Sequence, residues 1–293
     1  MVSQPGEDDE KLDHIGFATV RKVLAGLTDA IVRRVKPRWI RNRTAIFLTR
    51  YERFGPLPWS DLPEGRRLCV VAPHPDDESI GCGGLIARWT REGRAADVVF
   101  LTAGEAGDRR LRQDELSTEQ AAAIRIDVAA ARHGEALAAL KHLGASGHWL
   151  DGVDGGLHGQ VDQLARQLSD LWSVTPPDVV AAPFPADRHP DHAMAARIVA
   201  IALARTATSP CILGYEIWSP APVNTLVSIN SVAGVKWAAI AAHRSQVTTT
   251  DYVSAAQGLN TYRAISGGRT GFAEGYFRTD IETFTALANE LRI

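Results

Sequence analysis

The sequence predicts an α/β fold, namely a Rossmann-like, doubly wound and mostly parallel sheet with helices on both faces, and two observations lead to it. From residue 67 onwards, short continuous apolar runs alternate with stretches in which apolar residues recur at helical spacing. Continuous apolar runs are typical of strands buried on both faces, as in parallel sheets covered by helices. The composition of the 293-residue chain, 45% hydrophobic and 23% charged, is that of an ordinary globular protein and excludes wholesale disorder.

Each predicted element rests on its own stretch of this pattern. Residues 68–72 (LCVVA) and 179–182 (VVAA) are apolar runs of strand length, whereas 119–143 is a long Ala-rich stretch with helical spacing. The predicted strands are 68–72, 97–102, 148–150, 179–182, 212–218 and 225–229. The predicted helices are 85–92, 119–143, 161–174, 193–207 and 231–243.

Residues 1–60 are expected to form an N-terminal basic helical extension, and residues 61–293 the α/β domain. Over residues 21–53, ten Lys and Arg residues stand against two acidic residues. Apolar residues in the first half of this stretch recur at helical spacing, which predicts an amphipathic helix that ends before Pro37. Two interpretations stay open. The helix packs on the main domain with its basic face in solvent, or it makes peripheral contact with an anionic membrane surface through residues 17–53.

Charge, cysteine content and hydropathy exclude several classes of protein. The 32 Lys and Arg residues nearly balance 34 Asp and Glu residues, so the formal net charge of −2 gives no basic field for nucleic acid. The three cysteines form no CxxC pair, which argues against a disulfide framework and a thiolate zinc site. No apolar stretch approaches the ~18 residues of a membrane span. The acidic N-terminus lacks the apolar core of a secretory signal. We therefore expect a cytoplasmic protein.

Two clusters of histidine and aspartate follow two different predicted strands. A His-Pro-Asp-Asp sequence comes after the strand at 68–72, and a His-Pro-Asp-His sequence follows the strand at 179–182, just before a helix. Because ligands of open α/β sheets bind beyond the carboxyl ends of the strands, we expect both clusters to converge on one site at that edge. The side chains expected there are His74, Asp76, Asp77, His189, Asp191 and His192.

Imidazole and carboxylate groups without a thiolate suit a catalytic metal site, for Zn²⁺ or for Fe²⁺, Mn²⁺ or a related divalent ion. Two ligands from the first cluster and one from the second would leave a coordination position for water. A cation held in this way can lower the pKa of water from 15.7 to about 7. The remaining carboxylate could accept the proton of that water, and the remaining histidine could stabilise an oxyanion or protonate a leaving amine. The pattern thus predicts metal-assisted hydrolysis of an amide.

Each cluster alone also has a structural explanation. Pro75 and Asp76 are both common in turns, and Asp191 could cap the helix that follows it. The glycines around Cys82 lack the spacing of either nucleotide-binding fingerprint, and we expect them to let helix and backbone approach the metal loop. Because both clusters occur together and each follows a strand, a metal site is the stronger hypothesis.

Residues 71–78 (VAPHPDDE) and 189–192 (HPDH) resemble the two hallmark motifs of the PIG-L/LmbE family of metal-dependent N-acetylglucosaminyl de-N-acetylases. Three shorter stretches fit the same family: 102–105 (TAGE), 132–135 (RHGE) and 243–246 (HRSQ). The similarity runs from about residue 67 to about residue 280. The N-terminal extension lies outside it.

The resemblance implies a metal centre and a base within the two motifs. It makes His74, Asp77 and His192 the metal ligands, for Zn²⁺ or for Fe²⁺ or another divalent ion. It makes Asp76 the general base on the metal-activated water.

The resemblance also implies roles for residues around this centre. His189 becomes the electrostatic or general-acid group that faces the tetrahedral intermediate, and Asp191 tunes the charge of a histidine. Arg132 and Asp154 match positions that contact substrate hydroxyls or phosphate in relatives. For Arg132, a salt bridge with Glu135 one helical turn away is the structural alternative.

The function implied by the resemblance is that of a zinc-dependent N-deacetylase, a hydrolase of linear carbon–nitrogen amides. It removes the acetyl group from an N-acetylglucosamine-type amino sugar, presented as a small molecule or a glycoconjugate. His243 lies near the pocket in the family, with no step assigned to it. A non-catalytic sugar-binding module of the same fold is one alternative. Another is an Fe(II)-dependent oxygenase with His74, Asp76 and His192 as its triad, although such enzymes usually use an all-β barrel.

Overall fold

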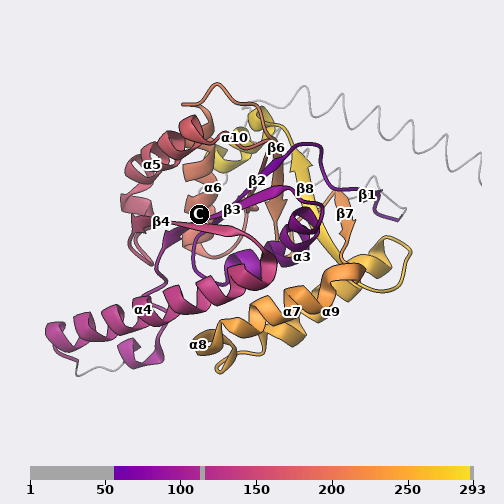
Figure 1. The fold of residues 1–293 in the computed structure, drawn as a ribbon. Helices are drawn as coiled ribbons and strands as arrows, with labels where there is room; N and C mark the ends of the chain where they lie inside the picture. The colour runs from indigo at the N-terminus through magenta and orange to yellow at the C-terminus, as the bar shows by residue number, and fades with distance from the viewer. Residues whose placement is uncertain (1–55, 113–115, 291–293) are drawn as a thin grey trace, which may run out of the picture. The chain divides into compact units, whose positions relative to one another are not determined.

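The computed structural model describes residues 56–112 and 116–290, which form one sheet of eight strands flanked by helices (Figure 1). The helical extension predicted for residues 1–60, with its predicted membrane contact at 17–53, lies outside the described residues except for its last few. Those last residues include strand β1 (Trp59–Ser60), which pairs with β7, so the sheet begins before residue 61. Among the described helices, none is long and apolar enough to cross a bilayer.

The sheet is mostly parallel, as the sequence predicts. Its strand order is β1-β7-β8-β6-β5-β2-β3-β4, and within the described residues only β8 runs antiparallel to its neighbours. Strand β2 lies in the interior of the sheet, between β3 and β5. The strands after β1 are β2 (Arg67–Ala72), β3 (Ala95–Thr102), β4 (Ser146–Gly152), β5 (Val179–Pro183), β6 (Cys211–Tyr215), β7 (Thr225–Ser228) and β8 (Ala273–Thr279).

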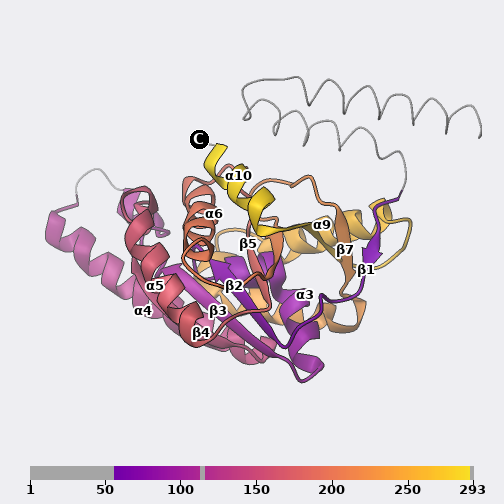
Figure 2. The same cartoon turned by 90° about the horizontal axis from the view of Figure 1, so that it is seen from above.

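Helices cover both faces of the sheet (Figures 1 and 2). Helices α3, α4 and α7 pack on one face, and α5, α6 and α10 on the other. The α-helices are α3 (Asp77–Arg91), α4 (Thr118–Leu143), α5 (Val161–Val174), α6 (Pro190–Leu203), α7 (Ala233–Ala242), α8 (Arg244–Val247), α9 (Tyr252–Ser266) and α10 (Ile281–Glu290).

Strand β2 shows why an apolar run without alternation forms a central strand here. Leu68, Val70 and Ala72 belong to the hydrophobic core on the α3 side of the sheet. Cys69 and Val71 belong to the core on the α6 side. Both faces of the strand are therefore buried, and each fully buried aliphatic side chain of this size contributes about 1.5–3 kcal/mol to folding. The strand is fixed at the point where the first motif leaves it.

Helix α3 begins earlier than the sequence predicts. The predicted helix at 85–92 starts in the structure at Asp77, because the glycines of this segment weaken its helical signal. A Cβ atom at Gly81 would collide with the ring of Tyr215, and one at Gly83 would press on the side chain of Lys236. The glycines thus let the side chains of Tyr215 and Lys236 approach α3. The expected approach of helix and backbone to the loop before α3 stays a prediction.

The C-terminal part of the fold differs most from the prediction. The strand expected at 212–218 ends at Tyr215, and the helix expected at 193–207 ends at Leu203. Helices α9 and α10 and strand β8 were not predicted. The signals of β8 and α9 are weak because these elements bury polar side chains, such as Glu274 in β8 and Asn260 in α9, which break the apolar pattern. This reason does not apply to α10, whose buried residues are apolar.

Candidate metal centre

Both sequence motifs lie at the same edge of the sheet. Strands β2 and β5 pair directly, so their carboxyl ends are side by side, and α3 and α6 begin close after them. The six side chains expected from the motifs do converge there, on the floor of a cleft of about 470 Å³. The motif residues that line this cleft are His74, Asp76, Asp77 and His189. Asp191 and His192 are buried against His74 and Asp77.

Three side chains direct one ligand atom each toward a common point. His74 Nδ1 lies 3.2 Å and His192 Nε2 lies 3.3 Å from Asp77 Oδ2. One ligand atom from each of the three lies within 4.8 Å of the others, and all three residues are buried. Among the described residues, neither ring nitrogen of His192 makes a hydrogen bond, which leaves Nε2 available to a cation. Two imidazoles and a carboxylate suit Zn²⁺, Fe²⁺ or Mn²⁺.

A second, overlapping group of ligands is less suited to a cation. His74, His189 and Asp191 also bring ligand atoms within 4.8 Å of one another. However, His189 Nδ1 accepts the backbone N–H of Asp191 at 3.3 Å, so His189 is the N-cap residue of α6. Asp191 Oδ2 accepts the backbone N–H of Gly155 at 2.7 Å. Asp191 therefore does not cap α6 with its side chain, as its position in the sequence allowed; its carboxylate faces the histidines instead.

Carboxylates lie against the other ring nitrogens of the two histidines that could hold a cation. His74 Nε2 is 3.1 Å from Asp154 Oδ1 and 3.2 Å from Asp191 Oδ2. His192 Nδ1 is 3.3 Å from Asp187 Oδ1. Carboxylates in this position orient metal-bound histidines and increase their basicity. Asp154, expected at the substrate, lines the cleft and contacts His74.

Asp187 is a site residue that the sequence analysis did not single out. It is buried, and its carboxylate accepts the backbone N–H groups of His189, Trp218 and Ser219 at 2.9, 3.0 and 3.1 Å. These bonds fix the loop between β5 and α6 while the same carboxylate faces His192. The available signal was its place two residues before His189, in the same polar loop.

The electrostatics of the centre favour a cation. Burial opposes charge on His74, but the carboxylates of Asp154, Asp191 and Asp77 raise its pKa well above the usual value. Burial likewise opposes charge on His192, yet Asp77 and Asp187 raise its pKa to about 9. The excess of carboxylates thus binds protons where a divalent ion would bind, and a metal must displace those protons.

Asp76 combines a strained backbone with a raised pKa. Its φ of 130° makes it the one non-glycine residue with positive φ in the described parts of the chain, a conformation that costs on the order of 1–3 kcal/mol. Burial raises the pKa of its carboxyl to about 6, against the lowering effect of Arg132. Strain and a raised pKa on a carboxylate at a cleft floor are typical of a catalytic base.

Arg132 supports the loop that carries Asp76. Its guanidinium donates to the carbonyl oxygens of Gly104 and Pro75, and Nη2 lies 3.3 Å from Asp76 Oδ1. Glu135, the alternative partner, instead accepts the backbone N–H and hydroxyl of Ser245. Arg132 lines the cleft but is almost fully buried.

Glu78 and His243 form a buried pair behind Asp76. Glu78 Oε2 accepts the backbone N–H of Asp76 at 2.9 Å, and Glu78 Oε1 lies 2.9 Å from His243 Nε2. Burial opposes charge on both, but the pairing lowers the pKa of Glu78 and raises that of His243. Sequence analysis left His243 without a role and did not consider Glu78, although it completes the first motif.

The outer wall of the cleft is aromatic and basic. The rings of Trp218 and Tyr252 meet edge to face, with centroids 6.3 Å apart. Arg109 and Arg112, on a short 3₁₀ helix (Arg109–Arg112), line the same cleft and are exposed. The wall therefore offers an apolar surface and two cationic groups to a ligand that binds in the cleft beside Asp76 and Asp77.

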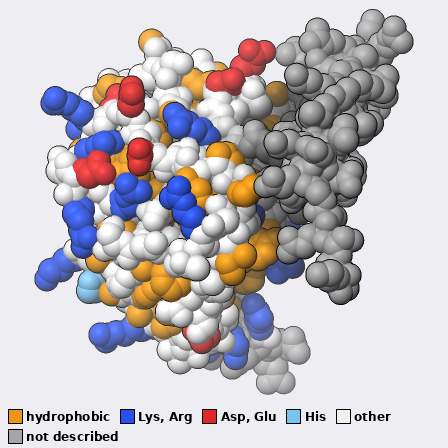
Figure 3. Space-filling model, turned by 90° about the vertical axis from the view of Figure 1, so that its right-hand side faces the viewer, with side chains coloured by type: hydrophobic (Ala, Val, Ile, Leu, Met, Phe, Trp, Pro, Cys, Tyr) orange, Lys and Arg blue, Asp and Glu red, His pale blue; other side chains and the backbone are white. Residues whose placement is uncertain are grey.

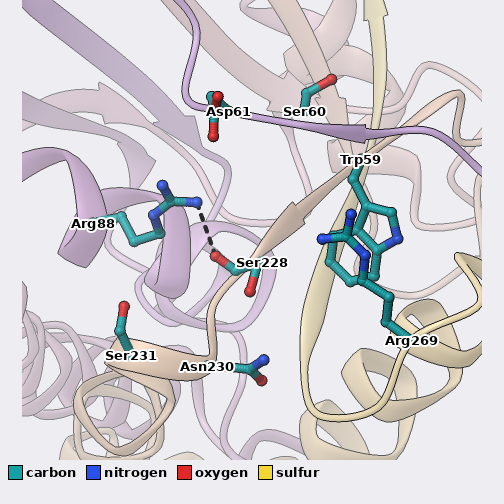
Figure 4. Close-up of a pocket in the computed structure, with 8 residues that line it drawn as sticks. All are labelled: Trp59, Ser60, Asp61, Arg88, Ser228, Asn230, Ser231 and Arg269. Atoms are coloured by element: carbon teal, nitrogen blue, oxygen red, sulfur yellow. Dashed lines mark hydrogen bonds between the residues drawn. The ribbon is translucent and has the colours of Figure 1, made fainter.

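A second hollow, of about 480 Å³, lies beside β1 and β7 (Figure 4). It holds one carboxylate and no histidine among its lining residues, which are Trp59, Ser60, Asp61, Arg88, Ser228, Asn230, Ser231 and Arg269. Lys and Arg side chains are scattered among apolar and acidic ones over the part of the face that Figure 3 draws in colour. Among the described residues, both groups of side chains that could hold a metal ion include His74, which lines the first cleft.

Comparison with known proteins agrees with this picture. The family model described as PIG-L, GlcNAc-PI de-N-acetylase, matches residues 69–203, which span both motifs. A 1D-myo-inositol 2-acetamido-2-deoxy-α-D-glucopyranoside deacetylase from Saccharomonospora viridis is 31% identical over 229 residues, covering 62% of this chain and 85% of that protein. Of seven other curated relatives with that name, the chain spans 50–66% of the length.

Solved structures share the fold. The conserved protein TT1542 from Thermus thermophilus is 32% identical, with a TM-score of 0.58 over 71% of this chain and 92% of that one. The N,N'-diacetylchitobiose deacetylase from Pyrococcus horikoshii, 21% identical, has the same fold with a TM-score of 0.62 over 75% and 85% of the two chains. Sequence identity over most of a relative's length, together with the match across both motifs, shows that the chain belongs to the PIG-L family.

Proposed function

We propose that the protein is a metal-dependent hydrolase that removes the acetyl group from an N-acetylglucosamine-type amino sugar. The observation that carries the proposal is the buried group His74, Asp77 and His192, beside which Asp76 is left free to act as a base. The family and the names of the relatives, which are deacetylases of amino sugars, support the substrate class.

The donor set favours zinc as the resident ion. Three protein ligands without a thiolate are typical of catalytic zinc, which keeps a position open for water or substrate. When bound by these ligands, the cation polarises the amide carbonyl and lowers the pKa of water. The same donors accept Fe²⁺ or Mn²⁺, so activity after reconstitution with each ion identifies the working metal.

Asp76 acts as the base in this proposal. Its carboxylate, with a pKa of about 6, is mostly ionised at neutral pH and accepts the proton of the attacking water. Once protonated, the same group can return that proton to the leaving nitrogen.

His189 acts as the oxyanion donor. Its Nδ1 accepts the backbone N–H of Asp191, so the neutral ring carries its proton on Nε2. In the metal-free protein, burial and the positive charges of His192 and His74 lower its pKa, and a bound cation in their place would act in the same direction. An N–H donor of this kind contributes about 2.7–4 kcal/mol to transition-state stabilisation.

The cleft wall suits a sugar that carries a further group. Trp218 and Tyr252 offer apolar surface for the faces of a pyranose ring, and Arg109 and Arg112 lie at the rim, where an aglycone would extend. We infer that an anionic aglycone is bound better than a neutral one.

One assay tests the function against its alternatives. Metal-depleted protein is reconstituted with Zn²⁺ and incubated with N-acetylglucosaminides that differ only in the aglycone. We expect acetate and free amine in equal amounts. Sugar binding without release would indicate a non-catalytic module. In a parallel sample reconstituted with Fe²⁺ and supplied with 2-oxoglutarate and O₂, formation of succinate would indicate an oxygenase. The geometry disfavours the oxygenase, because Asp77, rather than Asp76, faces the two histidines.

A further inference from the structure

The backbone of Asp76 needs an external restraint. A φ of 130° with a ψ of −29° is far from the left-handed helical φ of about +57° that aspartate tolerates. The residue lies between β2 and α3, where its carbonyl accepts the N–H groups of Ser79 and Ile80 at 3.1 and 2.9 Å. These two bonds fix the carbonyl side of Asp76. The peptide on its amino side, between Pro75 and Asp76, needs a separate restraint.

The peptide between Pro75 and Asp76 is held from both of its edges. Its carbonyl accepts a hydrogen bond from Arg132, and its N–H donates to Glu78 Oε2 at 2.9 Å. The orientation of this peptide relative to the Cα atom of Asp76 is what defines φ. A donor on one edge and an acceptor on the other therefore hold the strained angle directly.

Glu78 is itself fixed by the adjacent Ser79 and by His243, which is distant in the chain. Its carboxylate accepts the hydroxyl of Ser79 at 2.6 Å and lies 2.9 Å from Nε2 of His243, and Glu78 and His243 are 0% and 1% exposed. His243 sits between α7 and α8, and the residues that follow it, including Gln246 and Thr249, line the cleft.

We propose that Glu78, held by His243, is the positioning residue that sets the backbone of Asp76 and so aims its carboxylate at the reacting atoms. The inference rests on the proposed function, since it assigns Asp76 the base. Neither Glu78 nor His243 lines the cleft, so both act through Asp76 rather than on the substrate.

Glu274 provides a matched control for Glu78. Its carboxylate is equally buried, accepts backbone N–H groups of the same helix, at Gly84 and Leu85, and pairs with the buried Lys236. It differs in having no contact with the loop of Asp76. A Glu→Gln change at either position removes one buried charge and leaves one accepting oxygen.

The test measures kcat, KM and zinc content of Glu78→Gln and Glu274→Gln, and the φ of Asp76 in crystals of both. We expect kcat of zinc-loaded Glu78→Gln to fall about 10- to 100-fold, as misplacement of a reacting group by about 1 Å does. KM and zinc content stay unchanged, and the peptide before Asp76 turns. Glu274→Gln loses thermal stability but keeps the kcat of its folded fraction.

If Glu78→Gln does not fold, two variants of His243 test whether the pair of Glu78 and His243 positions Asp76. His243→Gln keeps a donor for Glu78 and retains most of kcat, whereas His243→Leu behaves like Glu78→Gln. Wild-type kcat in both Glu78→Gln and His243→Leu, with Asp76 unmoved, would overturn the inference. Absence of acetate release by the wild-type protein would instead overturn the proposed function, and the turn of the Asp76 peptide could still be seen.

Discussion

Two buried clusters of charge lie along helix α3, and they differ in how completely their carboxylates are paired. One cluster lies near the middle of α3, around Glu274. This carboxylate accepts four hydrogen bonds, from the backbone N–H groups of Gly84 and Leu85, from Lys236 Nζ and from Tyr276 Oη, all at 2.6–2.7 Å. Every strong acceptor position there is filled from within the protein. A buried ion pair satisfied in this way has a structural role.

At the N-terminal end of α3 the balance is different. Carboxylates crowd around two histidines at 3.1–3.3 Å, and among the described residues neither ring nitrogen of His192 makes a hydrogen bond. Arg132 is the cationic side chain beside Asp76. The comparison teaches that the functional site lies where the fold gathers more buried negative charge than its own side chains neutralise. Three substitutions and one pH series test whether the two clusters differ in this way.

Removing a metal ligand has the largest expected effect. His74→Ala takes one of three donors from the centre, so we expect a folded protein whose zinc content and deacetylase activity fall close to zero. His148→Ala, at a half-exposed position on β4, is the control and keeps its zinc. Metal analysis of purified proteins with matched circular dichroism spectra measures this. A full zinc complement in His74→Ala would refute its role as a ligand.

Removing the base lowers the rate while the metal stays. We expect Asp76→Asn to lose on the order of 10²–10⁴ in kcat with unchanged zinc content. Because the base works in its ionised form and its pKa is about 6, kcat/KM of the wild type falls as the pH drops below about 6. A bound cation stabilises the carboxylate and shifts this fall to a lower pH. The acidic limb of the pH profile disappears in Asp76→Asn. An identical limb in that variant would assign the titration to another group.

Breaking the buried pair of Lys236 and Glu274 is expected to lower the unfolding free energy rather than the activity. Lys236→Met leaves the buried carboxylate of Glu274 without its cation, and breaking a pair of this kind costs about 3–5 kcal/mol of unfolding free energy. Urea denaturation measures this loss. Zinc affinity and kcat of the folded fraction stay at wild-type values, because Lys236 lies away from the cleft lining. A loss of zinc affinity of similar size would mean that the two clusters are coupled.

The pH dependence of zinc binding tests the crowded carboxylates without changing any side chain. The pKa of His192 is about 9 and that of His74 is also raised, so a cation must displace protons at neutral pH. Raising the pH removes this competition, and the apparent affinity increases about tenfold per pH unit for each proton displaced. Competition with a chromophoric chelator between pH 6.5 and 8.5 measures the slope. An affinity that does not change with pH would show that the histidines are already neutral.

The sequence predicted the centre of the sheet and the convergence of the two motifs for a simple physical reason. β2 is buried on both faces, so its apolar run is continuous. The proposed ligands His74 and Asp77 follow it within five residues, and the pairing of β2 with β5 brings the second motif to the same edge.

The parts that the sequence did not predict depend on polar contacts between distant segments. β8 carries the buried Glu274, whose partner Lys236 lies in α7, and no local pattern reveals such a pair. Glu78 and His243 are 165 positions apart and meet only in the folded chain. Helical spacing offered Glu135 as the structural alternative to substrate contact for Arg132, but the folded chain places the guanidinium against the loop of Asp76.

The aromatic wall of the cleft comes from a later stretch of the chain than the cation ligands. Trp218 and Tyr252 both follow residue 203, where the family match ends, whereas the ligands lie before it. If the wall contacts the substrate, as proposed, the loops that carry Trp218 and Tyr252 can be exchanged while the proposed cation ligands stay in place, provided that His243 is kept behind Asp76. Relatives with different substrate preferences are expected to diverge first in these loops, and chimaeras that exchange the loops alone are the way to transfer one preference to another protein.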